Sequence, residues 1–335
     1  MTNIQRRVAR SVSEYLEVVE KIAPTTFAGL WFRGQPNARY QLTPNVLREV
    51  TFTTDGRGQP IREDQIVRSS GSAVAGLHPE RMLDDFKRRA RPFLERDLKN
   101  DFEWMFLAQH HGLPTRLLDW STNALVALYF AASGAREGTE DADEACADYL
   151  DEKGTEHRDD GFAVFVIDPG MINSIICDVS DPIDIAAAPE QWAHYLRPTD
   201  DMIKSYAPIC VTAPHITPRL RAQSGTFTLH GANIHPLDWY TVTRPHITKI
   251  FIPNSVTRQI LQSLRRSGLT QSFIYPGLDS IAADIRIDES IRYQAELRAY
   301  FARVAADERA EQAARMSTKA RKPKRKSSAR KPARK

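Results

Sequence analysis

The side chains best suited to chemistry are concentrated in residues 109–132, which read QHHGLPTRLLDWSTNALVALYFAA. His110 and His111 provide two adjacent imidazoles, which can exchange protons near neutral pH. Arg116 and Asp119 lie three residues apart, close enough for a guanidinium–carboxylate pair within one turn. A glycine and a proline between these two pairs require the backbone to turn. We therefore expect a polar loop that presents functional side chains between two apolar helices.

Several common kinds of site are not indicated by this stretch. Adjacent histidines point apart on regular structure, and no H-x-x-x-H or C-x-x-C spacing occurs, so no metal site is predicted. Ser121, His111 and Asp119 contain the groups of a nucleophilic triad, but no G-x-S-x-G elbow is present and Ser121 is better explained as part of a helix cap. Phosphate-loop and dinucleotide-binding patterns are also absent. A purely structural alternative is that Arg116 pairs with Asp119 to fix the loop and that Trp120 belongs to the core.

A second candidate, Arg33, lies far upstream at the end of an expected strand. The neighbouring glycine allows another group to approach closely, and a guanidinium can grip two oxygens of a phosphate or carboxylate. The alternative is that Arg33 pairs with Asp119 in the core. If instead it lines a cleft, the site suits a nucleotide-like ligand, and we expect it to include Gln35, His110, His111, Thr115 and Gln223.

Taken together, these segments resemble the FRG domain of bacteria and phages. The resemblance is carried by HHGLPTRLLDWS…ALYFA and by Phe32-Arg33-Gly34-Gln35. Two later segments, RAQSGTF at residues 221–227 and YPGLDSIA at residues 275–282, resemble the downstream elements of that family. The resemblance spans roughly residues 27–285 and implies a polar cleft. The family's usual setting is compatible with a toxin or an anti-phage effector.

The order of the segments is also similar to that of ADP-ribosyltransferases, which hold NAD on an early strand and end with a catalytic glutamate on a late strand. Here Gln223 and Thr226 stand where the glutamate would be. The likeness implies NAD as a possible substrate, with no other cofactor indicated. A non-catalytic binding module is the alternative. The catalytic candidates are Arg33, His111 and Gln223, and the ligand-binding candidates are Gln35, His110, Thr115, Arg116, Asp119, Trp120 and Tyr129, with Trp120 or Tyr129 stacking on nicotinamide.

The net charge of +4 conceals two very different parts. Residues 316–335 contain ten Lys or Arg and no acid, so the rest of the chain has 36 basic and 42 acidic residues. A segment of this composition cannot bury a core, so we expect it to be disordered. Its charge suits non-specific binding to nucleic acid, with a solubility tail as the alternative. The predicted contacts are Lys319, Arg321, Lys322, Lys324, Arg325 and Lys326.

The remaining patterns predict an α+β fold, because helices dominate the first half and strands the second. Three widely spaced cysteines and no long apolar run favour a cytoplasmic protein without a membrane segment. We expect a mixed or antiparallel sheet, flanked by helices, from strands near 27–33, 162–167, 209–212, 226–229 and 247–252. The expected units are an N-terminal helix at 1–24, the FRG domain at 25–286 with an exposed acidic insertion at 135–160, an amphipathic helix at 287–315 and the tail at 316–335.

Overall fold

The computed structural model of the chain falls into two compact units, Met1–Pro276 and Gly277–Lys335. The first is an α+β unit, and the second contains one long helix, α12 (Leu278–Ala320). The structure describes residues 3–24, 26–48, 51–52, 74–75, 77–94, 97–151, 154–196, 207–213, 222–231, 233 and 235–320.

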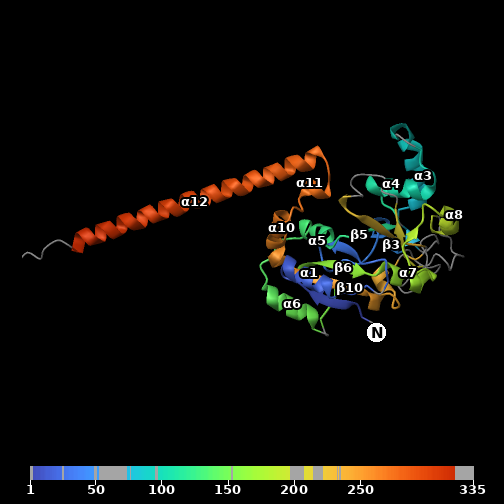
Figure 1. The fold of residues 1–335 in the computed structure, drawn as a ribbon, viewed down its shortest axis with the longest axis horizontal. Coiled ribbons are helices and arrows are strands. Elements are labelled where there is room, and N and C mark those ends of the chain that lie inside the picture. The colour runs from blue at the N-terminus through green and yellow to red at the C-terminus, as the bar shows by residue number, and fades with distance from the viewer. Residues whose placement is uncertain are drawn as a thin grey trace, which may run out of the picture. The chain divides into compact units, whose positions relative to one another are not determined.

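A mixed eight-stranded sheet forms the centre of the first unit (Figure 1). Its strand order is β1-β10-β6-β2-β5-β9-β8-β7, and the pairs β1/β10 and β7/β8 are parallel while the others are antiparallel. The α+β prediction is confirmed. The strands are β1 (Gln5–Val8), β2 (Trp31–Gln35), β5 (Leu117–Ser121), β6 (Gly161–Ile167), β7 (Ile183–Asp184), β8 (Ile209–Thr212), β9 (Gly225–Leu229) and β10 (Ile247–Pro253), with β3 (Thr51–Phe52) and β4 (Val74–Ala75) as a separate pair.

Helices cover both faces of the sheet. Apolar residues of α1, α5 and α10 pack on one face against β2, β6 and β10. On the opposite face, α6 and α7 contribute to a second cluster with the same strands, and α3 and α4 pack near β5, β8 and β9. The helices of this unit are α1 (Val12–Glu20), α2 (Asn45–Arg48), α3 (Pro79–Ala90), α4 (Asp101–His110), α5 (Ala124–Ser133), α6 (Ala142–Leu150), α7 (Pro169–Cys177), α8 (Pro189–Trp192), α10 (Thr257–Arg266) and α11 (Gln271–Ile274).

The central strands follow directly from their sequences. Strand β6 reads GFAVFVI and β10 reads ITKIFIP, and every residue of both strands is buried. Such nearly continuous apolar runs, interrupted in β10 by Thr248 and Lys249, are expected where helices cover a strand on both faces. The predicted strands at 162–167, 209–212, 226–229 and 247–252 are therefore confirmed to within one residue.

The strand predicted near residues 27–33 begins later, at Trp31. Two local features delay it. Thr26 is tied through its backbone N–H and its hydroxyl to the carboxylate of Asp168, and Gly29 adopts a left-handed φ of 72°. The strand also continues to Gln35, so Arg33 lies in the middle of β2 rather than at its end.

The acidic segment 135–160 was expected to be exposed, and the structure corrects this in part. It contains α6, whose N-terminus is capped by Asp141. Tyr149 on this helix is fully buried and stacks on Phe251 of β10, with ring centroids 4.7 Å apart. The high charge of the segment therefore conceals one short apolar helix face that joins the core.

The C-terminal part of the chain also differs from the expectation. One continuous helix, α12, replaces the separate helix predicted at 287–315. Its backbone remains helical through residue 320, so the first five residues predicted as disordered are helical. Residues 321–335, which hold most of the predicted nucleic-acid contacts, lie outside the described residues. Among the described parts of the chain, no helix combines the length and the apolar character needed to cross a membrane.

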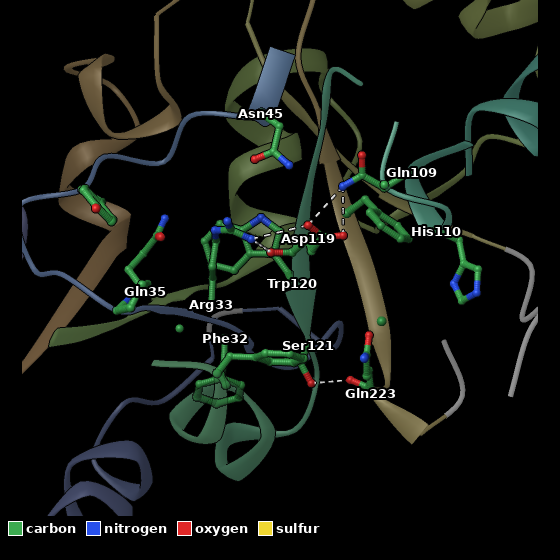
Figure 2. Close-up of a pocket in the computed structure, with 18 of the residues that line it drawn as sticks. Phe32, Arg33, Gln35, Asn45, Gln109, His110, Asp119, Trp120, Ser121 and Gln223 are labelled. Carbon is green, nitrogen blue, oxygen red and sulfur yellow. Dashed lines mark hydrogen bonds and ion pairs between the residues drawn. The ribbon is translucent and has the colours of Figure 1, made fainter. Parts of the chain in front are cut away.

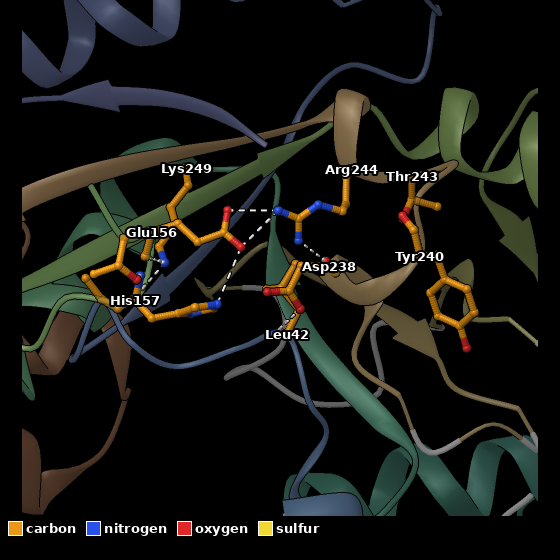
Figure 3. Close-up of polar contacts among 10 residues, drawn as sticks. Leu42, Glu156, His157, Asp238, Tyr240, Thr243, Arg244 and Lys249 are labelled. Carbon is orange, nitrogen blue, oxygen red and sulfur yellow. Dashed lines mark hydrogen bonds and ion pairs between the residues drawn. The ribbon is translucent and has the colours of Figure 1, made fainter. Parts of the chain in front are cut away.

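A buried lysine joins several loops to the sheet (Figure 3). Lys249 of β10 is 1 % exposed, and its Nζ donates hydrogen bonds to the backbone oxygens of Ala38 and Glu156. Both carboxylate oxygens of Glu156 accept from Arg244 at 3.0 Å. Burial lowers the pKa of Lys249 to about 8, although Asp238 and Glu156 act in the opposite direction.

We expect the free energy of unfolding of the wild type to rise relative to that of Lys249→Met between pH 8 and about 10.4, the ordinary pKa of lysine. In this window the folded protein has lost the Lys249 proton while the unfolded chain still binds it. Stability therefore increases with pH, by at most about 1.4 kcal/mol per pH unit. Urea unfolding at several pH values measures the difference. Parallel pH curves for the two proteins would contradict the prediction.

Candidate functional site

A cavity of about 780 Å³ lies where β2 and β5 meet. Its walls come from β2, β5 and β9, from α2, from the end of α4 and from α5 (Figure 2). The ladder between β2 and β5 contains a single pair, Phe32 with Ser121, whereas β2 pairs with β6 along its full length. Beyond that single pair, no ladder pairing joins β2 to β5. Side chains of both strands line the cavity there.

The three residues of the Phe-Arg-Gly triplet make different contacts. Phe32 is buried in the core, and Arg33 faces the cavity. Gly34 lies against α5, because a Cβ atom added there would be only 2.0 Å from the backbone oxygen of Ala127. The glycine therefore allows a helix to approach the strand, where the sequence suggested the approach of a ligand.

Arg33 bridges the gap between the two strands. Its Nη1 donates to the backbone oxygen of Asp119 at 2.5 Å and lies 3.8 Å from Asp119 Oδ2. The Nε of Arg33 is buried without a hydrogen-bond partner. Burial lowers the pKa of Arg33 to about 10; Asp119 acts in the opposite direction, and Arg48 adds to the lowering. Arg33 is therefore still charged at neutral pH.

Asp119 is held in place by a chain of two hydrogen-bonded side chains. Gln109 Nε2 lies 3.1 Å from each carboxylate oxygen of Asp119. The hydroxyl of Thr115 donates to Gln109 Oε1 at 2.7 Å and accepts from the N–H of Leu117. Thr115 is buried behind the cavity and fixes the orientation of the Gln109 amide, whereas the Asp119 side chain is 59 % exposed.

Three further predicted residues line the same cavity. His110 and His111 lie at the end of α4, with ring centroids 5.1 Å apart and nearly perpendicular planes. Gln223 precedes β9; its side-chain amide donates to the backbone oxygen of Ile274, and its own backbone oxygen accepts from the Ser121 hydroxyl. Ser121 therefore fastens two segments together, while Asn123, two residues later, caps α5.

Besides Thr115, two predicted residues do not line the cavity. Arg116 is buried and donates to the Gly231 backbone oxygen at 2.9 Å and to Glu80 at 3.2 Å. The expected pair with Asp119 is wrong, because the stretch forms β5, and residues three apart on an extended chain point to opposite faces. Tyr129 is absent from the described lining, where its neighbour Phe130 takes part instead.

The other aromatic candidate, Trp120, is 3 % exposed and lines the cavity from β5. Its Nε1–H donates to the Thr228 hydroxyl at 3.1 Å, so the ring is fixed. Gln35 lines the cavity from the end of β2, and its amide lies 3.4 Å from the Gln41 backbone oxygen. Both residues therefore shape the wall, and little of the Trp120 ring is open to solvent.

Sequence reasoning missed a second guanidinium, Arg48, and its neighbours Tyr40 and Asn45. They are brought to the cavity by the short helix α2 and the turn before it. Arg48 Nε donates to the Thr43 backbone oxygen at 3.0 Å, and partial burial lowers the pKa of Arg48 while Asp119 opposes this. No spacing in the sequence links this helix to the Phe-Arg-Gly strand, so only the fold identifies it.

Positive charge outweighs negative charge among the described residues that line the cavity. His230, which follows β9, is fully buried, and neither ring nitrogen has a hydrogen-bond partner. The pKa of His230 falls to about 3 through burial and through the charges of Arg116 and Arg33. Of the described residues that line the cavity, Asp119 is the one acid, against two arginines. The cavity is therefore suited to an anionic ligand. Within the described ranges, no group of three or more His, Cys, Asp or Glu is placed to hold a metal ion.

Comparison with known proteins gives one match. The FRG domain family model matches residues 28–140, which include β2, α2, α4, β5 and α5. The two downstream segments at 221–227 and 275–282 lie outside this match. No curated protein and no solved structure matches the chain.

We expect Gly34→Ala to destabilise the protein by about 3 kcal/mol or to prevent folding, because the new methyl group would overlap the backbone of α5. Gly277→Ala is the matched control, since a Cβ added at Gly277 has no heavy atom within 4 Å. Chemical denaturation of the two variants measures the contrast. Equal stability of both would show that α5 does not pack this closely on β2.

Proposed function

The chain carries an FRG domain, and from that premise we propose that its cavity binds a phosphate-bearing, nucleotide-like ligand. The observation that carries the proposal is the exposure and the hydrogen bonding of the Arg33 side chain. Its side chain is 12 % exposed, it opens into the cavity, and its buried Nε has no hydrogen-bond partner. A ligand oxygen in the cavity would accept hydrogen bonds from the part of this guanidinium that remains exposed.

The surrounding residues match the parts of such a ligand. Arg33 and Arg48 supply planar guanidinium groups that can each contact two phosphate oxygens. Arg33 is largely removed from water, which strengthens its interaction with an anion. Phe130 and Tyr40 provide aromatic surface for a base. The volume also falls within the range of roughly 300–1,000 Å³ that is usual for small-molecule sites.

An NAD-using reaction like that of ADP-ribosyltransferases is the enzymatic form of this proposal. It is supported by the adjacency of β2, β5 and β9, because Arg33, Trp120 and Gln223 then border one cavity. The segment with Gln223 lacks a carboxylate, but Asp119 supplies one from β5. Asp119 would orient a ribose hydroxyl and stabilise positive charge that develops on the sugar, while His111 would transfer a proton. By resemblance to the family, such an activity would serve a toxin or anti-phage system.

The basic tail supports a second proposal, a non-catalytic module that the tail holds on DNA or RNA. Residues 321–335 carry nine Lys or Arg and no acid. Dense positive charge binds phosphate backbones through release of counterions and without reading the sequence.

We expect Arg33→Lys to fold with a melting temperature near that of the wild type, because the lysine ammonium can still donate to the Asp119 backbone oxygen. The variant should bind the ligand at least about tenfold more weakly, a loss of about 1.4 kcal/mol. Lysine keeps the charge but loses the planar fork that holds two oxygens. Titration calorimetry with NAD, ADP-ribose and AMP measures affinity, and thermal melts measure stability on the same preparations. Arg116→Lys is the matched control: it alters a buried arginine outside the cavity and should lower stability while leaving affinity unchanged.

The same titrations separate the two forms of the proposal. Release of nicotinamide from NAD, abolished in Asp119→Asn, supports the enzyme. Binding of AMP without cleavage of NAD supports the binding module. A marked loss of stability in Arg33→Lys with unchanged affinity would show that Arg33 serves only to join β2 to β5.

Deletion of residues 321–335 should leave the melting temperature unchanged and weaken binding to duplex DNA. The slope of log affinity against log salt should also become shallower by several units, since each lost phosphate contact removes about 0.9. Fluorescence anisotropy at a series of salt concentrations measures both effects. Equal affinities and slopes for the two proteins would exclude the tail as the contact.

A further inference from the structure

The second compact unit contains a long helix with an apolar stripe. In α12, every residue from 285 to 314 is exposed. Most protein helices gain their stability from packing of an apolar face, and exposed apolar patches of this kind mark interaction sites. Seven large apolar side chains lie within 18 residues of this helix and are 36–62 % exposed; they are Ile287, Ile291, Tyr293, Leu297, Tyr300, Phe301 and Val304.

The spacing of these residues is that of a coiled-coil seam. Positions 287, 290, 294, 297, 301 and 304 alternate in steps of three and four, and four of the six are Ile, Leu, Phe and Val. Ser290 and Gln294 occupy the other two positions. Tyr293, Tyr300 and Ile291 lie beside the seam and widen it. Glu308 and Glu311 hold the next two seam positions, so the seam ends after Val304.

We propose that this seam is covered by the α12 helix of a second copy of the chain, packed antiparallel to the first. The seam consists of residues 287–304, and its two-fold axis passes between residues 295 and 296. The inference is independent of the function proposed for the cavity.

The side-chain volumes favour the antiparallel arrangement. In this register Phe301 lies opposite Ser290 of the second copy, Leu297 opposite Gln294, and Ile287 opposite Val304. Each large residue then meets a smaller or similar one, and the layers have even volume. In a parallel pair, Phe301 would meet Phe301 and Ser290 would meet Ser290, which gives one crowded layer and one hollow layer.

The charged residues beside the seam also favour the antiparallel orientation of the two helices. The antiparallel register brings Arg286 beside Asp307 of the second copy and places Tyr293 beside Tyr300. In a parallel pair, Arg286 would instead lie beside Ile291 of the second copy, and this opposite-charge pair would be lost. The opposed helix dipoles also favour the antiparallel pair.

The available area is sufficient for a reversible dimer. Aromatic side chains present about 150–250 Å² each, so seven large apolar residues that are about half exposed offer on the order of 600 Å² per helix. A pair would bury about 1,200 Å², which is the lower limit of specific interfaces. We therefore expect association in the micromolar range.

The test is sedimentation equilibrium of the full-length protein over a concentration series. The wild type should approach twice the monomer mass as its concentration rises. Leu297→Glu and Phe301→Glu should raise the dissociation constant by at least about tenfold. Ala295→Glu and Ala302→Glu introduce the same charge on the opposite face of the helix and should leave it unchanged. Far-UV circular dichroism verifies that the variants fold.

A charge reversal tests the orientation. Arg286→Glu should weaken the dimer, and Arg286→Glu combined with Asp307→Arg should restore it. Wild-type protein that stays monomeric, or a dimer unaffected by Leu297→Glu, overturns the proposal. A dimer that depends on Leu297 but is not restored by the double reversal overturns the antiparallel arrangement.

Discussion

One hydrogen bond spans the opening at the centre of the sheet: the Arg33 guanidinium of β2 donates to the Asp119 backbone oxygen of β5. The ladder between β2 and β5 is reduced to a single pair, so the sheet would be weakly joined at its centre without another connection. Arg33 supplies that connection through the Asp119 backbone oxygen. The same opening that requires the bridge also provides the space for the cavity, so the scaffold and the candidate site have a common origin.

The neighbouring elements hold this opening at a fixed width. On one side, α5 packs directly on Gly34, with the Ala127 backbone where a side chain would otherwise lie. On the other, α4 packs on β9 through Phe106 and Phe227, whose ring centroids are 5.2 Å apart. The cavity lies between two helices that are each fixed by close packing, and this rigidity reduces the entropy that a ligand must overcome on binding.

The sequence predicted the composition of the site better than its geometry. Continuous apolar strands such as β6 are recognisable because their burial depends on local pattern alone. By contrast, LLDWS contains a charged residue and follows a glycine and a proline, so it reads as a loop; its strand conformation depends on pairing with β9 more than 100 residues later. That error placed Arg116 next to Asp119. Arg48 was missed for a related reason, because its distance from Arg33 is set by tertiary packing and leaves no trace in local spacing.

The contact between Arg33 and Asp119 has an evolutionary consequence. The shorter of the two distances runs to the main-chain oxygen, and the carboxylate lies farther away. Every amino acid at position 119 would supply that main-chain oxygen. The position of the Arg33 guanidinium is thus uncoupled from the identity of the side chain at position 119, and members of such a lineage can change that side chain while the fold and the guanidinium stay in place. An arrangement of this kind allows the lining of the cavity to diversify around a constant guanidinium.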